Sequence, residues 1–187
     1  MGRKGEDKVR LILDMDEVIV DMMNPLLRIY NKKHQANLSI EDIKEWGLPP
    51  EMKEIYKTKG FFVELPPLPG AIEGTRYLSK RHDVYIATSP SEDGDIAKEK
   101  MTWISLWLPK LMPKLIITHD KSVIKGDAIV DDCLDHIKYF NGIRIVMDRP
   151  WNRDYDMPHI RLESFDAIVG LVTRMNPRGI KCLAKGR

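Results

Sequence analysis

Carboxylates, hydroxyls and a lysine recur in this sequence directly after short apolar runs. The groups are Asp14 and Asp16 after the first run, Thr88 and Ser89 after the second, His119, Asp120 and Lys121 after the third, and Asp131 and Asp132 after the fourth. Short apolar runs are typical of parallel strands that are buried on both faces. Because the carboxyl ends of such strands meet at one edge of an open α/β sheet, we expect these side chains to converge there.

A cluster of carboxylates needs a cation to remain ionised, since two charges about 4 Å apart repel by about 4 kcal/mol at an effective dielectric of about 20. Oxygen ligands select a hard cation, and a few carboxylates completed by waters and a phosphate oxygen suit Mg²⁺. Zinc would call for His and Cys ligands, which are missing here. The cluster therefore predicts Mg²⁺ and a phosphoryl substrate. One carboxylate can act as nucleophile, screened by the metal and Lys121, and a second as acid and then base.

The elements that must position these groups follow the pattern of an α/β protein with a parallel sheet flanked by helices. Five strands are predicted, at residues 9–13, 84–87, 115–117, 128–130 and 144–147. Helical periodicity predicts a helix over residues 71–81 and another around Ile168 to Met175, which Ser164 could cap.

The stretch between the first two predicted strands is much longer than one crossover helix requires. It contains an apolar stripe from Met23 to Tyr30, a capping-box pair at Ser39 and Asp42, and a third helical pattern over residues 51–57. We therefore expect a small helical cap at residues 22–67, inserted into a core formed by residues 1–21 and 68–187.

Composition narrows the class of protein. The chain has 187 residues, 43% of them hydrophobic, and a formal net charge of +2. This length predicts one domain with an insertion, and the balanced charge argues against a partner that is a nucleic-acid polymer. No apolar stretch approaches the roughly 18 residues that span a membrane, and no signal peptide is recognisable, so a cytoplasmic location is expected. Two cysteines suggest a reducing compartment.

The order of the polar groups resembles that of the haloacid dehalogenase-like (HAD) phosphatases: Asp-x-Asp-x-Val after the first strand, Thr/Ser after the second, Lys after the third and Asp-Asp after the fourth. More narrowly, four segments look like the 5'(3')-deoxyribonucleotidases. They are residues 14–21 (DMDEVIVD), 61–71 (FFVELPPLPGA), 88–90 (TSP) and 118–122 (THDKS). The resemblance runs from about residue 9 to residue 132 and is weak afterwards.

This resemblance implies a Rossmann-like HAD core and Mg²⁺-dependent hydrolysis of (deoxy)ribonucleoside monophosphates through an aspartyl-phosphate. It implies that Asp14 is the nucleophile and that Asp16 is the acid/base. Thr88, Ser89 and Lys121 would hold the phosphate. The implied metal ligands are the carboxylates of Asp14 and Asp132 and the backbone carbonyl of Asp16. Asp131 would lie next to these ligands without touching the metal.

In this family, aromatic residues of the cap contact the base and sugar. Tyr56 and Trp46 are candidates for that role, and packing within the cap is an equal alternative for both. Met22, a further candidate for contact with the substrate, stands where relatives often have Phe, and Glu17 stands where Gly is usual. The base preference and the conformation of the loop after Asp16 are therefore open. Caps of this kind can also dimerise, so a homodimer is one of the expected assemblies, beside a monomer.

Several alternatives remain at this point. Another HAD phosphatase would act on a different small phosphate ester. A phospho-accepting receiver-like signalling domain also combines an acidic cluster with a hydroxyl and a Lys, but it places the accepting Asp after the third strand. Lys125 competes with Lys121 for the phosphate. The segment 149–153 could close over the phosphate or simply cover the edge of the sheet.

Overall fold

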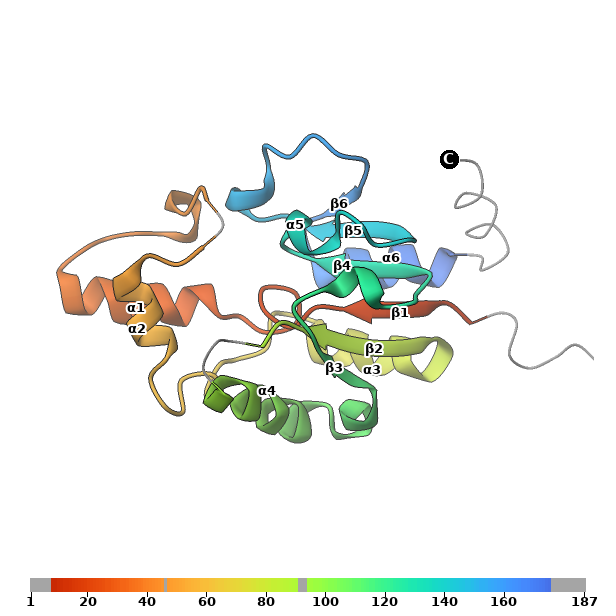
Figure 1. Cartoon of the computed structure of the whole chain (residues 1–187), viewed down its shortest axis with the longest axis horizontal. Coiled ribbons are helices and arrows are strands. Elements are labelled where there is room, and N and C mark those ends of the chain that lie inside the picture. The colour runs from red at the N-terminus through yellow and green to blue at the C-terminus, as the bar shows by residue number, and fades with distance from the viewer. Residues whose placement is uncertain (1–7, 46, 91–93, 176–187) are drawn as a thin grey trace, which may run out of the picture.

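The computed structural model describes residues 8–45, 47–90 and 94–175, and in these residues a six-stranded sheet forms the centre of the molecule (Figure 1). Its order is β3-β2-β1-β4-β5-β6, and every neighbouring pair is parallel. The strands are β1 (Arg10–Leu13), β2 (Asp83–Thr88), β3 (Leu115–Ile117), β4 (Ala128–Asp131), β5 (Ile143–Met147) and β6 (Ile160–Leu162). The α/β parallel fold predicted from the sequence is confirmed.

The prediction of five strands was wrong, because the described sheet also contains β6 beside β5. β6 lies at the edge of the sheet, where its residues are exposed or half-buried and where Arg161 separates Ile160 from Leu162. An edge strand does not need the continuous apolar run that marks a strand buried on both faces. The sequence signal that identified the other five strands is therefore absent from this one.

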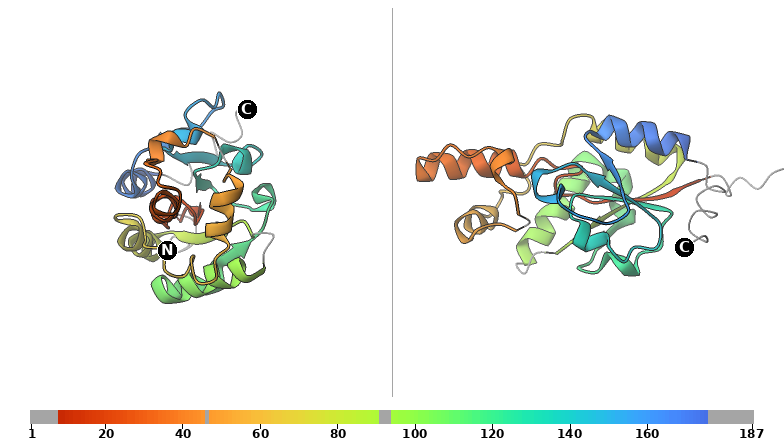
Figure 2. Two further views of the ribbon diagram at one scale, coloured as in Figure 1. Left: turned by 90° about the vertical axis from the view of Figure 1, so that its left-hand side faces the viewer. Right: turned by 90° about the horizontal axis from the view of Figure 1, so that it is seen from above.

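Helices cover both faces of the sheet (Figure 2). α3 (Ala71–Arg81) and α6 (Phe165–Arg174) lie side by side on one face. α4 (Gly94–Trp107) packs into the same apolar cluster as these two helices, and Arg76 of α3 donates to the Trp107 carbonyl of α4 at 2.9 Å. The short α5 (Leu134–Ile137) packs into a second cluster on the opposite face. Short 3-10 helices complete the connections: η2 (Pro109–Lys114), η3 (Lys121–Val123) and η4 (Pro150–Asn152). The predicted helix over residues 71–81 is confirmed, and the Ser164 hydroxyl caps α6 by accepting a hydrogen bond from Ala167 N at 3.2 Å.

Alternating side chains of β1 build the core on both faces. Leu11 and Leu13 are fully buried in the larger apolar cluster with residues of α3 and α6. Ile12 between them is fully buried in a second cluster, with Leu134 and Ile137 of α5. Because its side chains are buried on both faces, β1 lies inside the sheet and not at an edge, and the chain leaves the sheet directly after Leu13.

The segment between β1 and α3 forms a helical insertion, defined here as residues 22–67, which extends from the carboxyl ends of the strands (Figure 1). Its elements are α1 (Met23–His34), η1 (Ile40–Asp42) and α2 (Pro50–Tyr56). The predicted pair Ser39 and Asp42 forms a capping box at η1. The two connections to the core are joined, since Asp21 N donates to Pro66 O at 2.9 Å and Leu68 N donates to Ile19 O at 2.8 Å.

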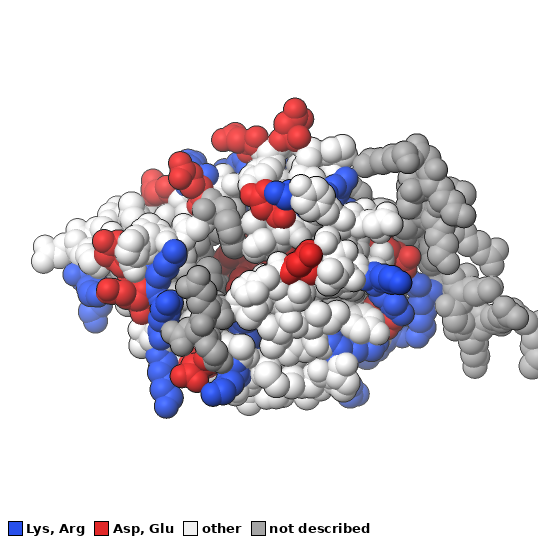
Figure 3. Space-filling view, in the orientation of Figure 1, with Lys and Arg blue, Asp and Glu red and all other residues white. Residues whose placement is uncertain are grey.

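Charged residues of both signs alternate over the face shown in Figure 3, in agreement with a formal charge of only +2. Among the described residues, none of the helices combines the length and the hydropathy that crossing a membrane requires.

The contact between α3 and α6 depends on Gly74. A Cβ atom at this position would lie 2.6 Å from Cδ1 of Phe165 and 2.8 Å from Cγ2 of Val169. We expect Gly74→Ala to lower the free energy of unfolding by about 1–3 kcal/mol, because α6 must move away. Gly170→Ala in α6 is the matched control, since its Cβ meets only the Arg174 guanidinium at 3.8 Å. That substitution should raise stability by about 0.5–1 kcal/mol. Urea denaturation measures both, and equal effects would contradict this packing.

Candidate functional site

The polar groups that the sequence places after separate strands meet at one edge of the sheet. Asp14 follows β1, Thr88 is the last residue of β2, and Asp131 is the last residue of β4. Carboxylate oxygens of Asp14, Asp131 and Asp132 lie within 4.8 Å of one another, and all three residues are buried. β1 lies between β2 and β4, so the cluster is at the point where the strand order reverses. This is the usual place for a ligand in an open α/β sheet.

Lys121 lies inside this cluster. Its Nζ is 2.6 Å from Asp14 Oδ1 and 2.6 Å from Asp131 Oδ2, and its side chain has no exposed surface. Burial lowers the pKa of Lys121, but the charges of Asp131 and Asp14 outweigh burial and hold the pKa above its usual value. The ammonium is therefore a permanent cation between two carboxylates. His119, after the same strand, is exposed.

A second lysine, Lys100 of α4, also enters the site, and our sequence analysis missed it. Its Nζ lies 2.8 Å from Asp16 Oδ2, 2.8 Å from Thr88 Oγ1 and 3.1 Å from the Ser89 carbonyl. The residue is 2% exposed. A signal was present: Lys100 falls on the apolar stripe of α4 with Ile96, Trp103 and Ile104, at i, i+4, i+7 and i+8. A charged side chain on the buried side of a helix needs a partner of opposite charge inside the protein.

The cluster has the chemistry of a divalent-cation site. Two ammonium groups, from Lys121 and Lys100, face the four carboxylates of Asp14, Asp16, Asp131 and Asp132, which leaves an excess of two negative charges. Asp16 Oδ1 and Asp132 Oδ1 are buried and have no hydrogen-bond partner among the described residues. Burial, followed by the neighbouring charges of Asp131 and Asp14, raises the pKa of Asp132 well above its usual value. An oxygen-bound divalent cation beside Asp14, Asp131 and Asp132 would satisfy the free oxygen of Asp132 and offset the charge, so these residues fit the predicted metal.

A pocket of about 440 Å³ lies between the acidic cluster and the helical insertion. Asp14, Asp16, Ser89 and Lys100 line its inner end. Acidic atoms are visible in Figure 3 at the hollow between the insertion and the sheet.

The remaining walls of the pocket come from the insertion and from the far side of the cluster. Met22 and Tyr56, both predicted to contact substrate, line the pocket, as do Lys53, His136 and Trp151, which were not predicted to do so. Tyr56 also makes edge contacts with Phe61 and Phe62, at centroid distances of 6.3 and 6.4 Å, so packing and pocket lining coexist. Trp46, the other aromatic candidate, lies outside the described residues.

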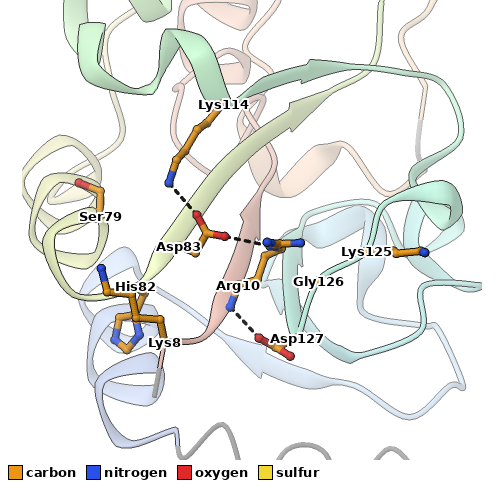
Figure 4. Close-up of a pocket in the computed structure, with 9 residues that line it drawn as sticks. All are labelled: Lys8, Arg10, Ser79, His82, Asp83, Lys114, Lys125, Gly126 and Asp127. Carbon is orange, nitrogen blue, oxygen red and sulfur yellow. Dashed lines mark hydrogen bonds and ion pairs between the residues drawn. The ribbon is translucent and has the colours of Figure 1, made fainter. Parts of the chain in front are cut away.

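Another hollow, of about 480 Å³, lies at the opposite edge of the sheet (Figure 4). It is lined by Lys8, Arg10, Lys114 and Lys125 together with Asp83 and Asp127. Asp83 accepts from Arg10 Nε at 2.9 Å and from Lys114 Nζ at 2.7 Å, so these cations are already paired. Lys125, the alternative to Lys121, is at this edge and is exposed. Of the two lysines, Lys121 is the one at the acidic cluster.

Comparison with solved structures shows the fold. A haloacid dehalogenase-like hydrolase from Burkholderia xenovorans matches with a TM-score of 0.58 and 13% identity, over 88% of this chain and 96% of that one. The HAD-hydrolase YfnB from Bacillus subtilis, a structure bound to magnesium, matches with a TM-score of 0.56 and 12% identity, over 89% and 99%. The Rossmann-like HAD fold implied by the resemblance is therefore confirmed.

Sequence comparison is more specific. The human mitochondrial 5'(3')-deoxyribonucleotidase is 30% identical over 149 residues, which cover 71% of this chain and 65% of that protein. The human cytosolic type is 30% identical over 66% of this chain and 70% of its own length. The 5'(3')-deoxyribonucleotidase of Bacillus subtilis is 25% identical over 77% and 87%.

The match to a family model covers nearly all of the described chain. Residues 7–176 match the model of the 5' nucleotidase, deoxy (pyrimidine), cytosolic type C proteins. The two aspartates after β1, the hydroxyls after β2, the lysine after β3 and the aspartate pair at β4 all lie within the matched range. The four motifs predicted this assignment: the chain belongs to the 5'(3')-deoxyribonucleotidase family and has a HAD-like fold.

Proposed function

We propose that this protein is a Mg²⁺-dependent phosphomonoesterase that hydrolyses deoxyribonucleoside or ribonucleoside monophosphates to nucleoside and phosphate. The observation that carries the proposal is that the two aspartates after β1 are each paired with a different buried lysine. Asp14 lies 2.6 Å from Lys121, and Asp16 lies 2.8 Å from Lys100, at the inner end of one pocket. Two carboxylates in different environments can perform two different roles in one reaction.

Asp14 is the nucleophile in this proposal. A carboxylate oxygen of Asp14 attacks phosphorus, an aspartyl-phosphate forms, and the bond from phosphorus to the nucleoside oxygen breaks. Asp16 gives its proton to that departing oxygen. Asp16 then takes a proton from water, the water oxygen attacks phosphorus, and phosphate leaves with Asp14 restored.

The environment of Asp16 suits an acid. Burial raises the pKa of Asp16, and the charge of Lys100 opposes this effect without cancelling it. A carboxyl group whose pKa lies above the usual range of Asp holds its proton for the leaving group more readily near neutral pH. Lys100 also keeps the Asp16 side chain fixed beside Thr88, where the substrate phosphate would lie.

Several groups of this chain would hold the phosphate. Lys121 and Lys100 supply positive charge, and the Thr88 hydroxyl and the buried, unpartnered Ser89 hydroxyl supply donors. The carboxylates of Asp14 and Asp132 and the backbone carbonyl of Asp16 would hold Mg²⁺. Asp131 would lie next to these ligands without touching the metal. When bound, the metal ion supplies Lewis-acid screening of the phosphoryl oxygens.

The helical insertion would act as the cap over the substrate, with residues 22–67 as cap and residues 1–21 and 68–187 as core. The paired connections at Asp21 and Leu68 support this division. Met22 and Tyr56 would contact the nucleoside, because they belong to the insertion and line the same pocket as Asp14 and Asp16. Relatives named as 5'(3')-deoxyribonucleotidases support a deoxynucleotide as substrate.

A HAD phosphatase for another small phosphate ester is the alternative within the same chemistry. A receiver-like signalling domain has no support, since Asp14 and Asp16 share the end of β1 and the chain matches a nucleotidase family.

Loss of the nucleophile provides the first test. We expect Asp14→Asn to lower phosphate release from deoxynucleoside monophosphates by about 10⁴-fold or more, because an amide cannot form the acyl phosphate. Asp135→Asn, which changes an exposed carboxylate outside the cluster, should retain wild-type turnover. Circular dichroism checks the fold of each variant. Turnover by a folded Asp14→Asn protein would exclude the assigned nucleophile.

Substrate class and metal dependence are tested together. A panel of ribonucleoside and deoxyribonucleoside monophosphates and sugar phosphates should show phosphate release from nucleotides. EDTA should remove that activity and added Mg²⁺ should restore it, since the excess negative charge of the cluster needs a divalent cation. Preferential turnover of sugar phosphates would favour the alternative ester, and full activity in EDTA would contradict the metal.

The missed lysine yields a third prediction. Replacing Lys100 with Met removes a cation that contacts both Asp16 and Thr88, and kcat should fall by about 10²–10³-fold. Lys98→Met is the matched control, because Lys98 lies on the same helix with a side chain that is 79% exposed. Steady-state phosphate release measures both variants. A kcat within threefold of wild type for Lys100→Met would remove Lys100 from the phosphate site.

A further inference from the structure

Glu17, directly after Asp16, has an uncommon backbone conformation. Its φ angle is +55°, in the left-handed region that favours glycine, and its side chain is only 2% exposed. The Glu17 carboxylate oxygen Oε1 accepts hydrogen bonds from Met22 N at 2.9 Å and from Met23 N at 2.7 Å. These amides begin α1, whose N-cap residue Met22 makes no capping bond of its own and whose first turn has no acidic residue. Glu17 therefore caps the first two amides and places a buried negative charge at the start of this helix, while the exposed Asp21 accepts from the next amide, Asn24 N, at 3.3 Å.

Arg149, after β5, holds Glu17 at two points. Its Nε lies 2.9 Å from Glu17 Oε2, and its Nη2 donates to the Glu17 carbonyl at 2.7 Å. The Arg149 side chain is 12% exposed. A planar guanidinium can make both contacts at once, which a lysine ammonium on a flexible stem cannot do equally well.

The residues that follow Arg149 hold Asp132. Trp151 Nε1 donates to Asp132 Oδ2 at 3.0 Å, and Asn152 Nδ2 donates to the Asp132 carbonyl at 2.7 Å. All three residues are buried. One short segment, residues 149–152, therefore contacts both the start of α1, through Glu17, and a carboxylate of the acidic cluster.

The same turn has one more contact with the helical insertion. Arg153 Nη1 lies 2.7 Å from Glu41 Oε2 of η1, but both side chains are about half exposed. Exposed pairs of this kind contribute little. The buried contact between Glu17 and Arg149 is therefore the main link.

We propose that the Glu17–Arg149 pair is a positioning element that couples the placement of α1 to cation binding at Asp132. The proposal rests on the proposed function in one respect, the assignment of Asp132 as a metal ligand. A cation that fixes the Asp132 carboxylate also fixes Trp151 and Arg149, and through them Glu17 and the first turn of α1. The coupling is reciprocal, so a correctly placed α1 favours cation binding to the same extent.

The test uses the double variant Glu17→Gln/Arg149→Met, which removes both charges and leaves no buried charge unpaired. Arg144→Met is the control, since Arg144 donates to the Lys138 carbonyl on an exposed part of β5. Mn²⁺ alone is the probe of affinity, by titration without nucleotide. We expect the dissociation constant for Mn²⁺ to rise about tenfold or more in the double variant and to stay unchanged in the control.

Hydrogen exchange separates coupling from a loss of stability. Mg²⁺ should slow amide exchange in α1 of the wild-type protein and of Arg144→Met, and this effect should disappear in the double variant. A purely structural pair would change the exchange rates but would leave the effect of Mg²⁺ in place. With nucleotide present, KM should rise more than kcat falls.

Arg149→Lys keeps the charge and should give an intermediate Mn²⁺ affinity, so this variant provides the test if the double variant does not fold. Unchanged Mn²⁺ affinity in a folded variant, or α1 protection by Mg²⁺ that survives the substitution, overturns the proposal. Wild-type protein that binds Mn²⁺ without protecting α1 overturns the coupling and leaves the phosphatase assignment intact. Coupling in a protein that hydrolyses no nucleotide overturns the proposed function instead.

Discussion

Electrostatic repulsion among buried carboxylates is the constraint on which the rest of this structure depends. Asp14, Asp131 and Asp132 lie within 4.8 Å of one another where little water reaches them. Lys121 relieves part of the repulsion from inside the cluster, and the fold uses three strands and a 3-10 helix to keep that ammonium in place. Such a site is less stable than an apolar edge of the same size, and it persists because the sheet around it is well packed.

α4 connects this site to the helical insertion through three successive contacts. Lys100 binds Asp16, Thr88 and Ser89, while the adjacent Glu99 accepts from Gly60 N at 2.6 Å and Phe62 N at 3.0 Å. One turn later, Trp103 Nε1 donates to Leu65 O at 2.8 Å. α4 therefore holds both Asp16, the acid/base candidate, and residues 60–65, through which the insertion rejoins the core. These contacts set the position of the insertion relative to Asp16.

Much of this arrangement could be predicted from the sequence, because apolar runs and strand-end chemistry are local signals. They predict Asp14, Asp16, Thr88, Lys121 and Asp132 at one edge of the sheet, where the structure has them. β6 could not be found this way, since an exposed edge strand lacks the apolar run. Lys100 is only half visible in the sequence. Its place on the apolar stripe of α4 indicates that it is buried, but local periodicity does not identify its partners, which are 84 residues away at Asp16 and 12 residues away at Thr88.

The left-handed conformation of Glu17 also constrains how this sequence can change over time. Glycine would relieve the backbone at that position, but it would leave the Arg149 guanidinium without its carboxylate and the Met22 and Met23 amides without their acceptor. Replacing Arg149 first would leave a buried carboxylate without its cation. Either single step passes through a destabilised intermediate, so the two positions are epistatic and should be exchanged as a pair along a lineage. Two residues separated by 132 positions are thus expected to change together.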